Sequence, residues 1–402
     1  MNKPHWVRAY IGRGPSELPT PDELISGGLR PAHIVWPLVA RRNLRRLLRA
    51  FVAVPAMSKQ TREAHRRIVT VLAVLPDAAL DRFLVEPEVT SWLAGVLGGA
   101  GWDGVRHLPA LSRAVIAAAG CAGVDCEPLD TACDGMTLTL RPLALDLIGA
   151  ANDSGDAVAW CEAGQIHVQR DGLHWVLRES TGKWETDGPA TQLAVTTGGA
   201  VVKGSPDPWL RDSFPTPTGT RISSDWDLAQ RIATGIREGI SLLEDSWPEM
   251  DVEIRSLLRW VVPLANEDSF FVPAFRGLVA VPDGRPLALC FHVIHELSHN
   301  IMSCLYDLVD IVKNPDDRVR SPFSRELEPL SSVIHSCWAF SHELRTVHRL
   351  RAADHLDAGT DWDRLILKIR IFYDKALPLI RKEGRLTSYG TALLDSVEAQ
   401  VY

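Results

Sequence analysis

The stretch His295-Glu296-Leu297-Ser298-His299 constrains this 402-residue chain more than any other part of its sequence. It lies within the mainly apolar run Leu287–Leu308, which predicts a buried helix. Histidines four residues apart lie one turn apart on one helix face, so their imidazoles can converge on one metal ion. Glu296, beside them, can serve as a general base or as a partner that orients a ligand. We therefore predict a metal centre on this helix.

A third protein ligand is expected further along the chain, because two imidazoles alone bind a metal ion weakly. The apolar pattern predicts a helix over Leu330–Arg351, and His335 follows its apolar start, so this side chain should face inward. We predict His295, His299 and His335 as the ligands. The other candidates are the carboxylates Glu326 and Glu328, followed by His342 and Glu343. His292 is expected to be either a partner of a ligand or a buried structural histidine.

The residues alone do not decide which metal ion the site binds. Three ligands and a bound water suit zinc-dependent hydrolysis, with Glu296 as the general base, and this is the commonest meaning of the motif. Two histidines with a third facial ligand and open positions also suit non-haem Fe(II) and oxygen chemistry.

The remaining sequence predicts an α+β fold that is mainly helical. Apolar periodicity predicts helices over most of residues 1–133, after a Pro- and Gly-rich arm over 1–35. Short alternating runs separated by Gly, Asp and Asn predict a small antiparallel β-sheet over 134–205. Helices are expected again over 206–402, including Asp227–Asp245 and Glu249–Leu264, with an extended segment over Phe270–Val281. These three stretches are the expected domains, and the last one carries the metal-binding region.

Composition and charge narrow the class of protein. The formal net charge is −7, which does not favour binding to nucleic acid or to an anionic membrane. No apolar run reaches the length of a membrane span, and no basic-then-apolar leader pattern opens the chain, so we expect a cytoplasmic protein. The seven cysteines form no CxxC pair, and we expect free thiols.

The stretch His295–Phe340 resembles a bacterial family of HExxH-motif peptide-modification proteins, also called 2-oxoglutarate/HExxH-type peptide beta-hydroxylases. The family helix is similar to His295–Met302, and a second family element is similar to Pro322–Phe340, where the family histidine falls on His335. Weaker similarities involve Ser205–Trp209, Phe275–Pro282 and Leu386–Gly390. The resemblance is close over the C-terminal half of the chain and loose over the N-terminal half.

The resemblance implies a function and a cofactor set. It implies an Fe(II)- and 2-oxoglutarate-dependent hydroxylase that acts on the beta carbon of a residue in a ribosomally synthesised precursor peptide. Glu296 would then orient neighbouring groups or handle a proton. The chain has Ile301 and Glu328 where the family has basic residues, so the distal carboxylate of the cosubstrate would need another cation. The candidates for that role are Arg325, Arg276 and Arg345.

Two further hypotheses stay open beside this one. A zinc-dependent metallopeptidase would use Glu296 as its base, and a non-catalytic peptide-binding protein would carry a decayed site. The arginines between Arg41 and Arg49 could form an anion-binding face, although a solvated helix face is the more common meaning of such a cluster. The expected partner is a precursor peptide, with no nucleic acid and no membrane, and a homodimer stays open.

Overall fold

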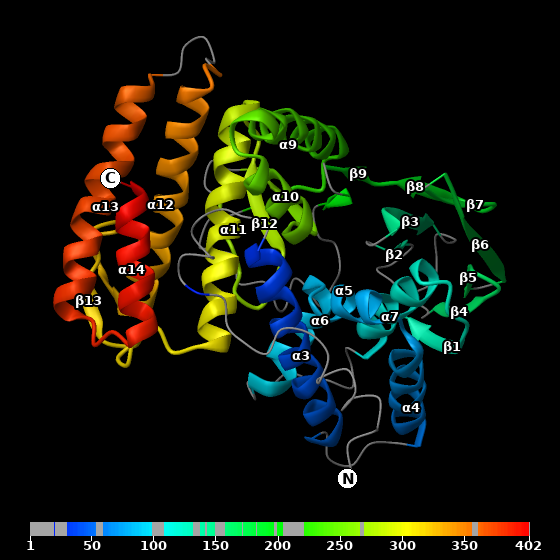
Figure 1. Cartoon of the computed structure of the whole chain (residues 1–402). Coiled ribbons are helices and arrows are strands. Elements are labelled where there is room, and N and C mark those ends of the chain that lie inside the picture. Colours follow the sequence, from blue (N-terminus) through cyan, green and yellow to red (C-terminus); the bar gives the residue numbers. More distant parts are fainter. Residues whose placement is uncertain are drawn as a thin grey trace.

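The HExxH residues lie on α11 (Pro286–Leu308), which runs through the middle of the molecule in the computed structural model (Figure 1). The structure describes residues 20, 30–53, 59–98, 108–131, 137–140, 143–148, 157–170, 172–181, 183–196, 199–203, 221–265, 269–355 and 361–401. Cys133, the similarity over Ser205–Trp209 and most of the predicted arm over 1–35 lie outside these residues. The arm prediction is wrong over its last residues, because 30–35 belong to the helix α3 (Arg30–Ala53).

A parallel strand pair leads directly into α11. The strands β11 (Trp260–Leu264) and β12 (Leu278–Pro282) pair in parallel, and both are buried along their whole length. Their four-stranded sheet has the order β12-β11-β10-β9, where β9 is Ala194–Val195 and β10 is Val201–Val202. A short turn joins β12 to α11, and Pro286 at the first position of the helix fits this start, since that residue needs no backbone N–H partner.

The predicted helix over 249–264 is wrong in its second half. The helix α10 ends at Leu257, after beginning at Pro248, and the chain continues as β11. The run Trp-Val-Val-Pro-Leu is apolar throughout, and such a run fits a strand buried on both faces as well as it fits a helix. Pairing with β10 and β12 decides between the two structures.

The helix α9 (Trp226–Ser246) packs closely on the beginning of α11. Gly235 and Gly239 lie one turn apart on α9 and permit this approach. A Cβ on Gly239 would collide with the backbone carbonyl of Pro286, whereas a Cβ on Gly235 would meet only the tip of the Leu289 side chain, at 2.5 Å. Backbone contact at Gly239 therefore fixes where α11 begins.

The C-terminal helices form one side of the molecule (Figure 1). The helix α12 packs between α11 and α13, and α14 also contacts α12. A short hairpin precedes α12 and pairs β13 with β14. The bounds are β13 (Arg318–Arg320), β14 (Leu327–Pro329), α12 (Leu330–Ala352), α13 (Trp362–Glu383) and α14 (Ser388–Val401).

The N-terminal half combines a helical group with antiparallel sheets, which confirms the predicted α+β class. The helices are α3 (Arg30–Ala53), α4 (Lys59–Val74), α5 (Asp77–Leu84), α6 (Pro87–Gly98) and α7 (Leu108–Cys121). The five-stranded sheet has the order β1-β4-β5-β6-β7, and all its strand pairs are antiparallel. Its strands are β1 (Cys126–Thr131), β4 (Ala157–Glu162), β5 (Gln165–Arg170), β6 (Leu173–Ser180) and β7 (Lys183–Thr186). A three-stranded antiparallel sheet holds β2 (Thr137–Leu140), β3 (Leu145–Ile148) and β8 (Ala190–Gln192).

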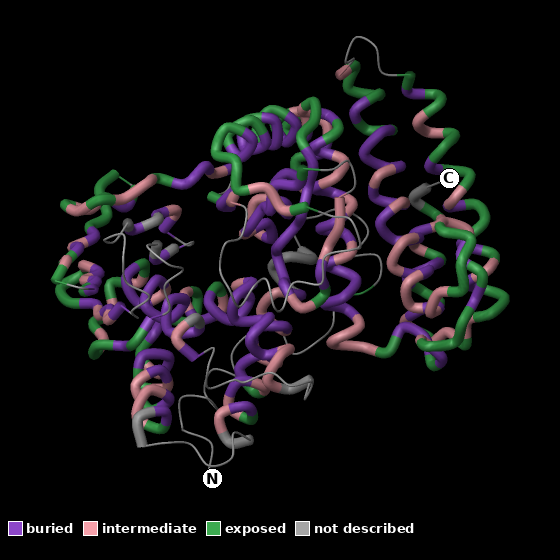
Figure 2. Tube along the Cα trace, turned by 180° about the vertical axis from the view of Figure 1, so that it is seen from behind, coloured by how far each residue is buried: buried purple, intermediate pink, exposed green. Residues whose placement is uncertain are grey.

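Burial follows this arrangement. The helices and strands in the middle of the molecule are buried on the faces that they turn toward one another, and exposed residues follow the outer helices and sheet edges (Figure 2). Within the part of the chain that the structure describes, we find no helix with the length and apolar character that crossing a membrane requires.

Candidate metal centre

The two histidines of the motif face each other on α11. The Nε2 atoms of His295 and His299 lie 3.1 Å apart, and both rings are largely buried. Two nitrogens bound to one tetrahedral metal ion at 2.0–2.1 Å lie about 3.3 Å apart. The spacing and chemistry of this pair therefore fit a shared first-row transition metal.

Glu343 of α12 orients His295 from the other side of its ring. The Nδ1 atom of His295 donates a hydrogen bond to Oε1 of Glu343 at 2.9 Å. This bond places the ring proton on Nδ1, so Nε2 keeps the lone pair that a metal ligand needs. The sequence suggests Glu343 only as a candidate ligand, whereas in the structure it is the hydrogen-bond partner of His295.

His335 lies beside the pair, as a ring neighbour of His299. Its ring stacks on that of His299, with ring centroids 5.8 Å apart. The ring of Tyr306 also stacks on that of His335, with centroids 5.2 Å apart. Across the described residues, no set of three or more His, Cys, Asp or Glu side chains is gathered closely enough to hold a metal ion. The structure thus brings the predicted third histidine to the site as a stacked neighbour of the pair.

Glu296 is held by a hydrogen-bonded chain behind the motif. Ser269, from the loop between β11 and β12, donates its hydroxyl to Oε1 of Glu296 at 2.7 Å. The Nδ1 atom of His292 lies 3.0 Å from the same hydroxyl oxygen, which has a lone pair left to accept. His292 therefore acts on Glu296 through Ser269, and neither residue was linked to Glu296 by sequence reasoning.

Burial sets the charge of each group in the centre. Burial lowers the pKa of His299 well below its usual range, and neighbouring His295 and His335 add to this effect. Burial also lowers the pKa of His335 to about 4, with a contribution from the charge of Arg276. For His295 burial acts downward, but the Glu343 carboxylate outweighs it and the pKa is raised. Burial raises the pKa of Glu296.

The other candidate ligands lie apart from the pair. His342 is buried, and its Nδ1 atom lies 3.0 Å from the backbone oxygen of Trp338 in its own helix. Glu328 is on β14 and accepts a hydrogen bond from Ser324 at 2.6 Å, while Glu326 is exposed in the preceding loop. The sequence pattern places His335 and His342 on one face of α12, but only His335 contacts the motif histidines.

The three arginines predicted to bind a cosubstrate have different surroundings. Arg325 is exposed in the loop before β14, and Arg345 stacks on the ring of Trp247, with 4.5 Å between its Cζ atom and the ring centroid. Arg276 is buried and bonds to the backbone oxygens of Asn300 and Ser303. Of the three, Arg276 is the one whose charge affects the pKa of a histidine in the centre, His335.

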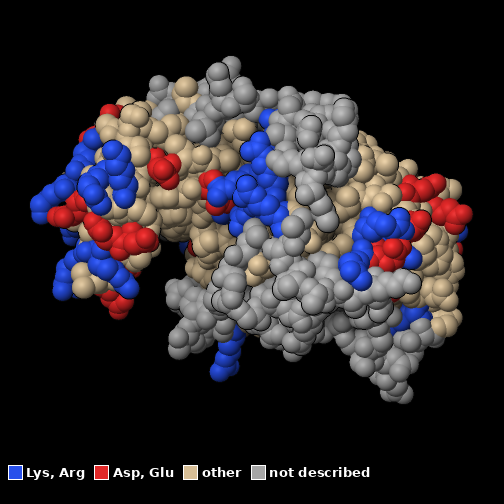
Figure 3. Space-filling model, turned by 90° about the horizontal axis from the view of Figure 1, so that it is seen from below, with Lys and Arg blue, Asp and Glu red and all other residues tan. Residues whose placement is uncertain are grey.

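Arg276 belongs to a basic cluster at the end of α11. It pairs with Asp307 at 3.1 Å, and Arg42 and Arg46 of α3 approach the same carboxylate at 3.6 and 3.9 Å. One carboxylate is therefore shared by three guanidinium groups, so the cluster keeps a positive charge. From below, basic side chains gather near the middle of the molecule, and mixed charges lie toward its ends (Figure 3).

Aromatic rings pack against both imidazoles of the pair. Phe271 stacks on His299 at 5.7 Å, and Phe340 meets His295 edge-on at 5.1 Å. Phe323 and Phe372 both contact Phe340, at 5.1 and 5.8 Å. These rings lower the local polarity and limit access of water to the imidazoles.

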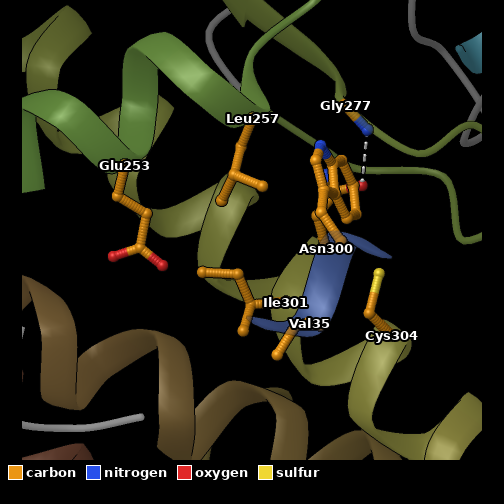
Figure 4. A pocket seen from close by; sticks show the side chains of 8 residues that line it. Val35, Glu253, Leu257, Gly277, Asn300, Ile301 and Cys304 are labelled. Atoms are coloured by element: carbon orange, nitrogen blue, oxygen red, sulfur yellow. Dashed lines mark hydrogen bonds between the residues drawn. The ribbon is translucent and has the colours of Figure 1, made fainter. Parts of the chain in front are cut away.

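A separate hollow lies on the opposite face of α11 (Figure 4). It is small, with a cavity volume of about 10 Å³, and its lining includes Glu253, Ile301 and Cys304. At one side Asn300 accepts a hydrogen bond from the backbone N–H of Gly277 at 3.1 Å. Residues 300, 301 and 304 are rotated by about 100–200° from His299 around the helix, so this hollow does not open on the imidazole pair.

Comparisons with known proteins identify no relative: neither a protein-family model nor any of the curated proteins compared matches this chain.

Proposed function

We propose that the protein is an Fe(II)- and 2-oxoglutarate-dependent hydroxylase that acts on the beta carbon of a residue in a ribosomally synthesised precursor peptide. One observation carries the metal-dependent part of this proposal: the imidazole pair of α11, with Nε2 atoms 3.1 Å apart and one ring braced by Glu343. The resemblance of residues 295–340 to the peptide beta-hydroxylases supports iron and the cosubstrate over other chemistry.

The imidazole pair fits two of the ligands of such an ion. His295 and His299 would bind it through Nε2, and His335 is the next imidazole within the site. The iron would supply oxygen activation when it is bound together with the 2-oxo acid. Glu343 keeps His295 in the required tautomer, and the two phenylalanine rings on the pair exclude water.

Glu296 has a positioning role in this proposal. Its carboxylate accepts a hydrogen bond from Ser269, and its burial favours the neutral form. It would hold Ser269 and His292 in place and exchange a proton with them, while hydroxylation itself needs no hydrolytic base. Arg276 is the cation that we assign to the cosubstrate carboxylate, because its charge already reaches His335.

The first experiment is anaerobic purification followed by metal analysis and titration with 2-oxoglutarate. We expect iron at one equivalent per chain and a visible absorption band that grows as the cosubstrate is added. Tightly bound zinc with no response to 2-oxoglutarate would overturn the proposed oxygenase function and favour the peptidase function. Replacing His335 with Ala should weaken iron binding, and His348→Ala is the matched control, since His348 is exposed on the same helix.

A zinc-dependent peptidase is the second candidate, and the position of Glu296 is the observation that favours it. A buried carboxylate with a raised pKa beside the imidazole pair is suited to accept a proton from a metal-bound water. Glu296→Gln separates the two functions. It should abolish peptidase activity while zinc stays bound, whereas a hydroxylase should keep partial activity with the same substitution.

A further inference from the structure

The outward face of the five-stranded sheet holds a second group of imidazoles, far from α11 in sequence. Burial alternates along β4, β5 and β6, so every second side chain points away from the core. Trp160, His167 and His174 all lie at outward positions. Trp160 pairs directly with His167, and His174 lies two residues before Val176, which pairs with His167 on the next strand.

The three rings lie nearly parallel to one another. Their centroids are 5.1 Å apart for Trp160 and His167, 5.6 Å for Trp160 and His174, and 5.5 Å for the two histidines. The interplanar angles are 8°, 8° and 15° in the same order. The Nδ1 atom of His167 lies 3.4 Å from Nε2 of His174, so the two imidazoles direct nitrogen atoms toward each other.

This nitrogen spacing is close to that of two ligands of one metal ion. Two imidazoles bound at 2.0–2.1 Å to a tetrahedral ion place their nitrogens about 3.3 Å apart. Adjacent strands hold both backbones through ladder hydrogen bonds, so small side-chain rotations suffice to bring the two lone pairs onto one ion.

The surroundings of His167 favour its neutral form, which can act as a ligand. Partial burial lowers the pKa of His167, and the nearby His174 lowers it further. Arg178 acts in the same direction and Glu162 in the opposite one, and both lie on the outward face of the same sheet. An imidazole without its second proton offers the lone pair that a metal requires.

We propose that His167 and His174 form a second metal site, which binds a divalent first-row transition ion such as Cu²⁺, Ni²⁺ or Zn²⁺ through two imidazoles. The described residues provide no third His, Cys, Asp or Glu ligand to this pair. Water completes the coordination, and Cu²⁺ binds most tightly because it leads the order of divalent ions at nitrogen sites. The site is independent of the proposed function, since it lies on β5 and β6.

The test is a titration of the full chain with Cu²⁺, monitored by calorimetry and by tryptophan fluorescence. We expect the double variant His167→Gln/His174→Gln to bind one Cu²⁺ equivalent fewer than the parent. His174→Gln alone should lower the affinity for that Cu²⁺ ion at least tenfold. Trp160 lies against both imidazoles, so bound Cu²⁺ should quench part of the emission. Trp160→Phe should keep the binding and lose that quenching.

Two controls keep the outcome interpretable. His348→Gln removes an exposed histidine of α12 and should leave the stoichiometry unchanged. Circular dichroism should show the same fold for the single variant His174→Gln, because that side chain is exposed. If the double variant binds as many Cu²⁺ equivalents as the parent with the same affinities, the two histidines only share a hydrogen bond and the proposal is wrong.

Discussion

Glu343 of α12 accepts a hydrogen bond from Nδ1 of His295 on α11, at 2.9 Å. The bond joins two helices that are separated in sequence by the hairpin β13–β14. Carboxylates in this position fix the tautomer and direction of a metal-bound imidazole, and losing one commonly costs 10–100-fold in metal affinity. The contact therefore gives α12 a role in the candidate centre beyond carrying His335.

Glu343→Gln should weaken iron binding by about 10–100-fold without unfolding the protein, because the amide keeps the shape and loses the charge. Dialysis against competing chelators would measure the change. Glu326→Gln is the control, since Glu326 is an exposed carboxylate in the loop before α12. Equal iron affinity in the two variants would show that Glu343 does not act on a bound ion.

Glu253 of α10 should make stability fall with rising pH. Burial raises the pKa of Glu253 to about 7, from 4.5 for the free side chain, against the opposing charge of Arg345. Between these values the unfolded chain releases the proton and the folded chain keeps it. The stabilising contribution is therefore complete below pH 4.5 and is lost as pH rises to about 7, by ~3 kcal/mol at most.

Urea unfolding of wild type and Glu253→Gln across this range would measure that contribution. We expect the difference in unfolding free energy between the two proteins to change between pH 4.5 and 7 and to level off above pH 7. Glu238→Gln, at an exposed position of α9, should show no comparable trend. A pH-independent difference for Glu253→Gln would mean that Glu253 is ionised in the folded protein.

The close approach of α9 and α11 predicts a sharp contrast between two glycines. Gly239→Ala should destabilise the fold by about 1–3 kcal/mol, because its Cβ would meet the backbone of Pro286. Gly235→Ala meets a flexible leucine tip instead, and alanine gains about 1 kcal/mol of helix propensity, so its net effect should be small. Thermal unfolding would compare them. Similar melting temperatures for both variants would contradict this account of the helix contact.

The sequence predicts an element best where the period of its apolar residues and the length of the run indicate the same type of secondary structure. The apolar run around the motif predicted α11 to within one residue, and the alternating runs predicted the antiparallel strands. The strand β11 was missed because an apolar run of five residues has no period of its own, and only its neighbours in the sheet decide its structure. The predicted start of the sheet region at 134 likewise omitted β1, a strand in which only two of the six residues are buried.

At the candidate site the sequence predicted the pair and missed its surroundings. Spacing alone places His295 and His299 on one helix face. Ser269 and Tyr306 lie at no recognisable motif position, and their contacts with Glu296 and His335 depend on how loops and helices pack. The arginine-rich helix that approaches Asp307 can be recognised in the sequence. Arg276, which also pairs with Asp307, comes from a distant loop and cannot.

The placement of the candidate centre between α11 and α12 has a consequence for folding. An ion held by both helices would join segments that the unfolded chain cannot bring together, so part of its binding free energy would become folding free energy. The midpoint of thermal unfolding should then rise with the concentration of free metal and fall with a chelator. The C-terminal helical side of the molecule, which packs on α12, should be the first region to gain hydrogen-exchange protection on loading.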